Sequence, residues 1–308
     1  MSSDPLTEEQ RPIRVSAGTE RLIDLPIPPE VRETLSSLER LHFELARRMN
    51  REPWKGIWTW CQRVVGATWI AAVTGRLLQV EGIEHVRDAY PRGPLLLVAN
   101  HRSYFDMFVV SSLLYRALPG SKRLTFPVTG QYYYQSLGGV ALNQFAAFWS
   151  MFPPLFALPS HTVSDRYALD LLVELCRRGP GQILGIHPEG GRNLGPDPYE
   201  FLRCQPGTGR IIHAARPIVI PCFIAGLDND VVAQVRRNWS GGEPVRVWFD
   251  EPVDLDAHYA LPGKGSTYKQ ITETVMTRVQ ALAERDRVRH APSGAAFGDT
   301  APPVPPDR

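Results

Sequence analysis

The chain has 308 residues, more than one hydrophobic core requires, and we attribute the excess to appended segments at its two ends. Its 34 Lys and Arg against 32 Asp and Glu leave a formal net charge of +2, and we expect no nucleic-acid partner. The four cysteines show neither a Cys-x-x-Cys pair nor metal-ligand spacing, which is typical of a reducing compartment and argues against a structural zinc site.

The two ends are predicted to be disordered tails. Residues 1–30 contain repeated prolines and charges without an apolar period, and residues 291–308 are rich in Pro, Gly and Ala. The first thirty residues also lack the apolar segment of a secretory signal. We therefore expect the active part of the chain to face the cytosol.

Residues 31–76 are predicted to form an amphipathic helical pair. The first helix spans about 31–49, and the second, about 56–75, is nearly long enough to cross a bilayer but carries a polar stripe. This region also holds seven basic and two acidic residues between positions 40 and 76, and four of the seven tryptophans, at 54, 58, 60 and 69. Cations beside Trp are typical of a membrane interface, so we predict that these helices dock on an anionic membrane surface without spanning it. The alternative is a helical hairpin packed on the core.

The first chemical motif follows a predicted strand over 94–99. Five apolar residues from Leu95 to Ala99 precede the sequence Asn100-His101-Arg102-Ser103-Tyr104-Phe105-Asp106, so His101 stands at the carboxyl end of a buried strand, where open α/β sheets place ligands. Asp106 can fix the tautomer of His101, so that the other ring nitrogen accepts a proton from a hydroxyl group. The alternative role for Asp106 is a capping box with Ser103 at the start of a helix over 104–117.

Residues 124–164 contain no Asp, Glu, Lys or Arg. They include nine aromatic residues, and Pro153-Pro154 must interrupt any helix there. We interpret this uncharged stretch as the lining for an acyl chain or as a membrane-dipping loop. An ordinary core is the alternative.

The second chemical motif follows a helix over 165–178 and a strand over 182–187. It reads His187-Pro188-Glu189-Gly190-Gly191-Arg192. A guanidinium group matches phosphate oxygens in a bidentate way, so Arg192 is the predicted phosphate ligand. We assign Glu189 to orienting Arg192 or to bonding an acceptor hydroxyl, with a structural ion pair between the two as the alternative.

The remaining elements complete an α/β pattern. Further strands are predicted at 77–82, 217–224 and 244–249, and further helices at 208–215 and 266–288. We predict one mixed sheet flanked by helices over 77–290, preceded by the helical pair.

The ordered set of motifs resembles the glycerolipid acyltransferase family. The resemblance rests on Asn100 to Asp106, on Pro188 to Arg192, and on three later segments, which are Gln205-Pro206-Gly207-Thr208-Gly209-Arg210, Pro217-Ile218-Val219-Ile220-Pro221 and Val245-Arg246-Val247-Trp248-Phe249-Asp250-Glu251-Pro252. It implies a membrane-associated enzyme that moves a fatty acyl group from acyl-CoA or an acyl carrier protein to a hydroxyl of a lysophospholipid or related glycerolipid, with lysophosphatidic acid as the first candidate.

The resemblance also implies roles for particular residues. His101 is the general base and Asp106 orients it, while Arg102, Ser103, Glu189, Gly190, Gly191 and Arg192 bind substrate. The oxyanion of the transition state is expected to meet backbone N–H groups near Gly190 and Gly191, or at the helix start after Ser103. We expect no metal and no cofactor beyond the acyl thioester, and a peripheral location on the cytoplasmic face of the inner or plasma membrane.

Several positions depart from the family pattern. Gly191 stands where Thr is usual, and His187 stands where an aromatic residue is common. The family's second block usually carries a cation for the acceptor's phosphate, whereas this chain has none between 124 and 164. Either Arg192 holds the phosphate with help from Lys122, Arg123, Arg166 or Arg203, or the acceptor is not a simple glycerol phosphate. A lipid transacylase, a hydrolase with the same dyad and an inactive membrane-binding protein are the alternatives.

Overall fold

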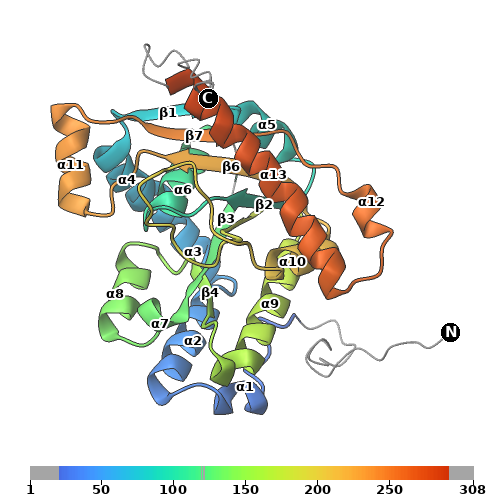
Figure 1. The fold of residues 1–308 in the computed structure, drawn as a ribbon. Coiled ribbons are helices and arrows are strands. Elements are labelled where there is room, and N and C mark those ends of the chain that lie inside the picture. The colour runs from blue at the N-terminus through green and yellow to red at the C-terminus, as the bar shows by residue number, and fades with distance from the viewer. Residues whose placement is uncertain (1–20, 119, 121, 291–308) are drawn as a thin grey trace, which may run out of the picture.

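The computed structural model describes residues 21–118, 120 and 122–290 and contains one seven-stranded sheet (Figure 1). The strand order is β1-β7-β6-β2-β5-β3-β4, and neighbouring strands are parallel except for the antiparallel pair β6 and β7. The strands are β1 (Leu78–Glu81), β2 (Leu95–Ala99), β3 (Arg123–Thr129), β4 (Met151–Leu155), β5 (Gln182–Ile186), β6 (Ile218–Ala225) and β7 (Val245–Phe249). The predicted α/β class with one mixed sheet is confirmed.

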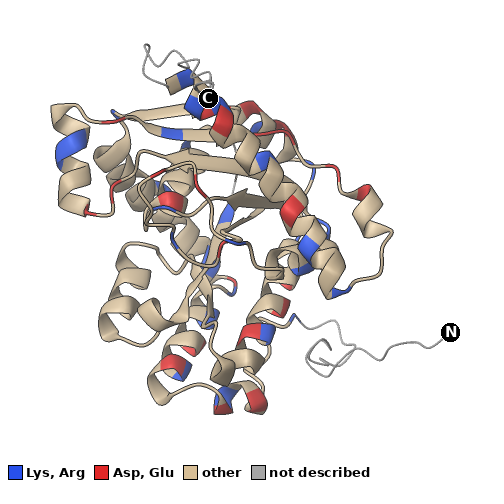
Figure 2. Ribbon diagram, in the orientation of Figure 1, with Lys and Arg blue, Asp and Glu red and all other residues tan. Residues whose placement is uncertain are grey.

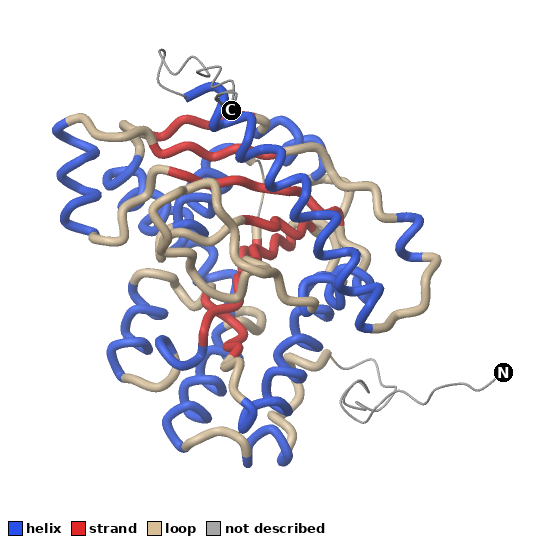
Figure 3. The backbone as a smooth tube through the Cα atoms, viewed as in Figure 1, coloured by secondary structure: helices blue, strands red, loops and turns tan. Residues whose placement is uncertain are grey.

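Helices cover both faces of this sheet (Figure 3). One face carries α1 (Pro29–Glu33), α2 (Ser37–Met49), α9 (Thr162–Cys176), α10 (Gly207–Ala215) and α13 (Gly265–His290). The other carries α4 (Ala67–Thr74), α5 (Ile83–Ala89) and α6 (Asp106–Ala117). The remaining helices are α3 (Trp54–Cys61), α7 (Gly130–Tyr133), α8 (Leu137–Phe145), α11 (Val231–Ser240), α12 (Asp256–Tyr259), a π-helical turn (Gln62–Gly66) and a 3-10 turn (Pro159–His161).

The uncharged stretch contains two strands that the sequence analysis did not predict. β3 and β4 form one end of the sheet, and β4 is its edge strand, which explains how Pro153 and Pro154 fit there: a proline lacks the N–H that an inner strand must donate. Most of the aromatic residues in this stretch are buried, but Tyr132 and Phe145 are exposed. The stretch is therefore largely core, with one exposed apolar surface on α7 and α8.

The predicted boundary of the N-terminal tail is wrong. Residues 1–20 and 291–308 lie outside the described residues, but residues 21–30 are packed, because Ile23 and Ile27 are buried in the main apolar cluster. The backbone N–H of Ile23 donates to Glu174 of α9 at 3.3 Å, and the guanidinium of Arg47 donates to the Ile23 carbonyl at 2.7 Å. These contacts fasten the segment that leads into α1.

The helices of residues 31–76 belong to the core of the protein. Two of the cations assigned to a membrane surface, Arg47 and Lys55, are buried, and the ammonium of Lys55 donates to the Leu124 carbonyl of β3 at 2.7 Å. Trp58 packs against Trp149, and Trp69 packs against Phe108. The helices therefore pack on the core along one side, whereas Trp54, Ile57, Trp60, Val64 and Val65 remain exposed along α3 and the π-helical turn, so that docking of this face on a membrane stays a prediction.

The first helix predicted in this region is divided into two in the structure, and the second is continuous. Ser36 and Glu39 form a capping box that separates α1 from α2, whereas the second helix runs on from α3 through the π-helical turn into α4. Among the described residues, no helix combines the length and the apolar character that crossing a membrane requires.

We predict that Lys55→Met destabilises the protein by about 2–4 kcal/mol, because the Asn50, Leu124 and Thr125 oxygens that accept from this ammonium lose their buried donor. Urea unfolding measured by far-UV circular dichroism tests this. Arg63→Met, at an exposed position on the π-helical turn, is the matched control and should change stability by less than about 0.5 kcal/mol. Equal stabilities of the two variants would contradict the anchoring role of Lys55.

Candidate active site

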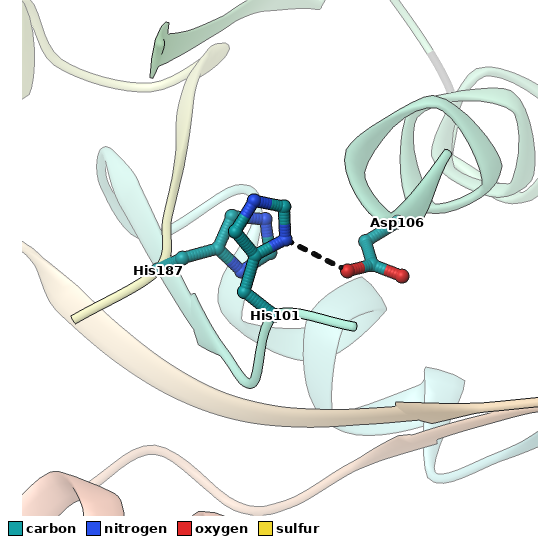
Figure 4. A group of neighbouring side chains, drawn as sticks. All are labelled: His101, Asp106 and His187. Atoms are coloured by element: carbon teal, nitrogen blue, oxygen red, sulfur yellow. Dashed lines mark hydrogen bonds and ion pairs between the residues drawn. The ribbon is translucent and has the colours of Figure 1, made fainter. Parts of the chain in front are cut away.

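The two chemical motifs meet because their strands are neighbours in the sheet. β2 and β5 are parallel, with Val98 opposite Ile186, so the loops that follow them leave the same edge. His101 and His187 come next in these loops, and their rings stack with centroids 4.0 Å apart and planes inclined by 9° (Figure 4). The site thus forms at the carboxyl ends of parallel strands.

His101 and Asp106 are hydrogen-bonded. The Nδ1 of His101 lies 3.0 Å from Oδ2 of Asp106, and the carboxylate is fully buried while the imidazole remains partly exposed (Figure 4). Because an ionised carboxylate only accepts, the proton lies on Nδ1, and Nε2 of His101 is left as an acceptor.

The same Asp106 oxygen also organises the backbone. Oδ2 accepts the N–H groups of Arg102 and Ser103, each at 2.9 Å, at the start of α6. The capping box is incomplete, since the Ser103 hydroxyl accepts from Phe105 and not from the Asp106 N–H. One oxygen therefore stabilises the helix start and orients His101.

Burial shifts the pKa of both partners. It lowers the pKa of His101 to about 4, with the Arg192 charge acting in the same direction. It raises the pKa of Asp106 to about 6, although the N–H groups of Ser103 and Arg102 oppose the shift. At neutral pH the ring is therefore neutral and the carboxylate ionised, which are the states that proton abstraction needs.

Glu189 holds the backbone of His101 in place. Its Oε1 accepts the His101 N–H at 2.9 Å, and its Oε2 accepts the Leu202 N–H at 2.6 Å. The Asn193 N–H donates to the His101 carbonyl at 2.9 Å, so both polar groups of the His101 backbone are bound by the second motif. The structure gives Glu189 this role and shows no ion pair with Arg192 among the described residues, so the predicted orientation of Arg192 by Glu189 is wrong.

Arg192 lies beside the dyad and is held by two other residues. Its guanidinium donates to Asn229 at 3.0 Å and stacks 3.4 Å above the ring of Tyr104. Asn229 also accepts the Tyr104 N–H, so it connects the two motif loops with the loop after β6. Sequence reasoning missed Asn229, and its signal was a polar residue shortly after the carboxyl end of a predicted strand.

Other cations considered for the phosphate differ in their placement. Lys122 is buried and Arg123 opens β3 beside Glu52, so both lie at the amino end of that strand, away from the site. Arg102 bonds the Gly195 carbonyl through Nη2, whereas its buried Nη1 has no hydrogen-bond partner among the described residues. Arg102 and Arg192 are therefore candidates for an anionic group, and exposed Arg203, which follows Leu202 in the loop bound by Glu189, stays a candidate as predicted.

The backbone donors of the site are already partly used. The N–H groups of Arg102 and Ser103 bind Asp106, and the Gly190 N–H donates to the His187 carbonyl in a turn where Gly190 has a φ of +69°. Among the described residues, no acceptor contacts the N–H groups of Gly191 and Arg192. The backbone N–H groups that remain as candidates for binding the oxyanion are therefore those of Gly191 and Arg192.

His101, Asp106 and His187 also offer three ligand atoms within 4.8 Å of one another. A metal needs lone pairs that converge on one point, but the in-plane lone pairs of two stacked, nearly parallel rings run side by side. The Nδ1 atoms of His101 and His187 also bind Asp106 and the Ala99 carbonyl. This donor set does not fit a metal ion.

Residues 77–225 match a family model described as Acyltransferase, which agrees with the family predicted from the sequence. A crystal structure of the 1-acyl-sn-glycerophosphate (LPA) acyltransferase PlsC from Thermotoga maritima is similar to the chain, with a TM-score of 0.44 and 19% identity. The similarity covers 80% of this chain and 95% of that one. None of the curated proteins compared with the chain matches it significantly.

We predict that Glu189→Gln lowers turnover about 10–100-fold, because an amide offers one acceptor oxygen where two N–H groups need one each, and His101 loses its fixed position. Steady-state kinetics test this, with the KM for the donor expected to stay within about twofold. Glu200→Gln, exposed in the same loop, is the control. Unchanged turnover in Glu189→Gln would contradict the positioning of His101 by Glu189.

Proposed function

Since residues 77–225 match the acyltransferase family model, we propose that the chain transfers a fatty acyl group from a thioester donor to a hydroxyl of a lysophospholipid or related glycerolipid. The observation that carries this proposal is the 3.0 Å bond between His101 and the buried Asp106 at the shared edge of β2 and β5. The donor is acyl-CoA or acyl carrier protein, and lysophosphatidic acid is the first acceptor to test.

The proposed reaction is a direct transfer. The acceptor hydroxyl gives its proton to Nε2 of His101 while its oxygen attacks the thioester carbonyl. The tetrahedral intermediate then expels the thiolate, which takes the proton from His101 and leaves as a thiol. Asp106 stabilises the imidazolium that exists between these two proton transfers, as a carboxylate does in other His-carboxylate pairs.

The oxyanion of that intermediate is assigned to the N–H groups of Gly191 and Arg192. They stand on the loop whose Glu189 and Asn193 bind the His101 backbone, so hydrogen bonds fix the base relative to the oxyanion donors. Arg192 and Arg102 are assigned to the acceptor's phosphate, because the charge of Arg192 acts on His101 and that of Arg102 acts on Asp106.

We further propose peripheral membrane binding through α8 and α11, in addition to the exposed apolar face of α3 and the π-helical turn in the region that the sequence suggested. Exposed apolar side chains gather on α8 and α11, including Leu137, Phe145, Val232 and Trp239. Asn229, which binds Arg192, stands directly before the first turn of α11, and α11 packs on α4. The two helices lie at the same side of the molecule in Figure 1.

The charges around this surface favour an anionic bilayer. Figure 2 shows no charged residue on α7 and α8, and neither residues 53–80 nor α11 contain Asp or Glu. Exposed Arg76 stacks on Trp239, Arg236 lies on α11, and Arg63 is exposed on the π-helical turn. A surface with apolar side chains, flanking cations and no anions meets the requirements of an anionic lipid interface.

We predict that His101→Ala lowers the rate of acyl transfer by ~10²–10⁴ at saturating donor, and that Asp106→Asn has nearly as large an effect. Mass spectrometry of lysolipids given acyl-CoA measures the products, and circular dichroism checks the fold. Retention of more than a tenth of wild-type turnover by His101→Ala would overturn the assignment of the base. Free fatty acid as the main product would instead indicate a hydrolase, and acyl transfer without a thioester a transacylase.

The pH dependence follows from the same pair. Burial raises the pKa of Asp106 to about 6, so kcat/KM should fall as the pH drops through about 6 and the carboxyl gains a proton. The neutral His101, with its pKa lowered to about 4, adds a second loss only in stronger acid. In Asp106→Asn the step near pH 6 should be absent, and its persistence would assign that step to another group.

For the membrane surface, we predict that Leu137→Ser with Phe145→Ser on α8, or Val232→Ser with Trp239→Ser on α11, weakens sedimentation with phosphatidylglycerol vesicles at least tenfold. Transfer to a water-soluble short-chain acceptor should stay within about twofold. Leu261→Ser with Val288→Ser, also exposed but on segments beside the opposite layer of helices, is the control. Equal vesicle binding by all three double variants would contradict this surface.

A further inference from the structure

His187 stands in the site without a role in the proposed reaction. It follows β5 directly, and its ring lies parallel to the ring of His101, with centroids 4.0 Å apart (Figure 4). Its Nδ1 lies 3.2 Å from the carbonyl of Ala99, the last residue of β2. Because a carbonyl only accepts, the His187 proton must lie on Nδ1.

We propose that His187 is a positioning residue that fixes the plane of the His101 ring by stacking beneath it. The inference rests on the proposed role of His101 as the base. The Asp106 bond at 3.0 Å fixes one edge of the His101 ring but leaves rotation about that bond. A flat ring against the face of His101 removes this freedom, because any tilt of one ring breaks the parallel contact.

The hydrogen bond to the Ala99 carbonyl fixes the position of the His187 ring relative to the end of β2. It joins the end of β5 to the end of β2, two residues before His101, so the support and the base are attached to the same strand. An aromatic hydrocarbon ring in place of His187 would keep the flat contact but lose this hydrogen bond. Stacking and anchoring can therefore be separated by substitution.

The neutral state of His187 is needed for this role. A proton on each ring would place two positive charges in contact, and burial lowers the pKa of His187 to about 3, so the ring stays neutral while His101 takes up its proton. The other charged or titratable groups around His101 are Asp106 of α6, the carboxylate of Glu189 at its backbone N–H, and the guanidinium groups of Arg102 and Arg192. Cys222 of β6 lies behind Asp106.

Three substitutions test the proposal: His187→Phe keeps a flat ring without the donor, His187→Asn keeps a donor without the ring, and His187→Ala removes both. We expect the kcat of the Ala and Asn variants to fall about 10–100-fold, while their KM values for donor and acceptor stay within about twofold of wild type. The kcat of the Phe variant should stay within about threefold of wild type. The kcat loss in the Ala variant should come with a rise of the His101 pKa from about 4 towards its usual value, because water reaches the face of the ring.

Full activity of the Ala variant, or rescue by Asn but not by Phe, would overturn the stacking role. Thermal unfolding of each variant identifies a folding defect, and NMR titration of the imidazole signals in a folded variant reports the pKa of His101 itself. His101→Ala, measured in parallel, distinguishes a failure of the proposed function from a failure of the role proposed for His187. If that variant keeps its activity, the proposed function fails, whereas a loss there with unaffected His187 variants removes this inference alone.

Discussion

The parallel pairing of β2 with β5 is the constraint on which the rest of the site depends. It brings two loops together that are more than eighty residues apart in the sequence, and they then exchange hydrogen bonds. Glu189 and Asn193 bind both polar groups of the His101 backbone, and His187 bonds the end of β2. Because these contacts involve backbone atoms at fixed strand ends, the position of the imidazole follows from the sheet and does not need a ligand to form.

The buried charge of Asp106 fixes the geometry of the loop between β2 and α6. A carboxylate without solvent is costly unless donors contact it, and Oδ2 meets two backbone N–H groups and the His101 ring, whereas the buried Oδ1 has no hydrogen-bond partner among the described residues. The first turn of α6 adds the favourable end of the helix dipole. Each donor must keep its place for the charge to remain, so residues 101–106 are held as one rigid turn. The Asp106 carboxylate thus fixes the loop that leads into α6 and also orients the base.

The sequence was most informative where local pattern and tertiary position agree. Leu95 to Ala99 predicted a buried strand, and the motifs after β2 and β5 placed His101, Asp106 and Arg192 at one edge of the sheet. It was least informative over 124–164, because an edge strand that contains Pro153 and Pro154 has no regular pattern, and burial of its aromatic residues depends on α2 and α9. Arg47 and Lys55 were wrongly predicted to be exposed for a related reason. Their carbonyl partners are distant in sequence, so the sequence cannot distinguish such a buried cation from a solvated one. The role of Glu189 was equally hidden, since its partners are backbone groups.

The distribution of charge around the dyad suggests how an amphiphilic acceptor would be oriented. α7 and α8 provide no cation, whereas Arg102 and Arg192 stand in the loops after β2 and β5. The polar head of an acceptor would therefore bind to these loops, and its acyl chain would lie towards the uncharged helices and the bilayer. Since Arg192 is held by Asn229 and Tyr104 and not by a carboxylate, its charge stays available for an anionic head. A cation neutralised by an ion pair would bind phosphate more weakly, so the separation of Glu189 from Arg192 leaves Arg192 available for the anionic head of the proposed acceptor.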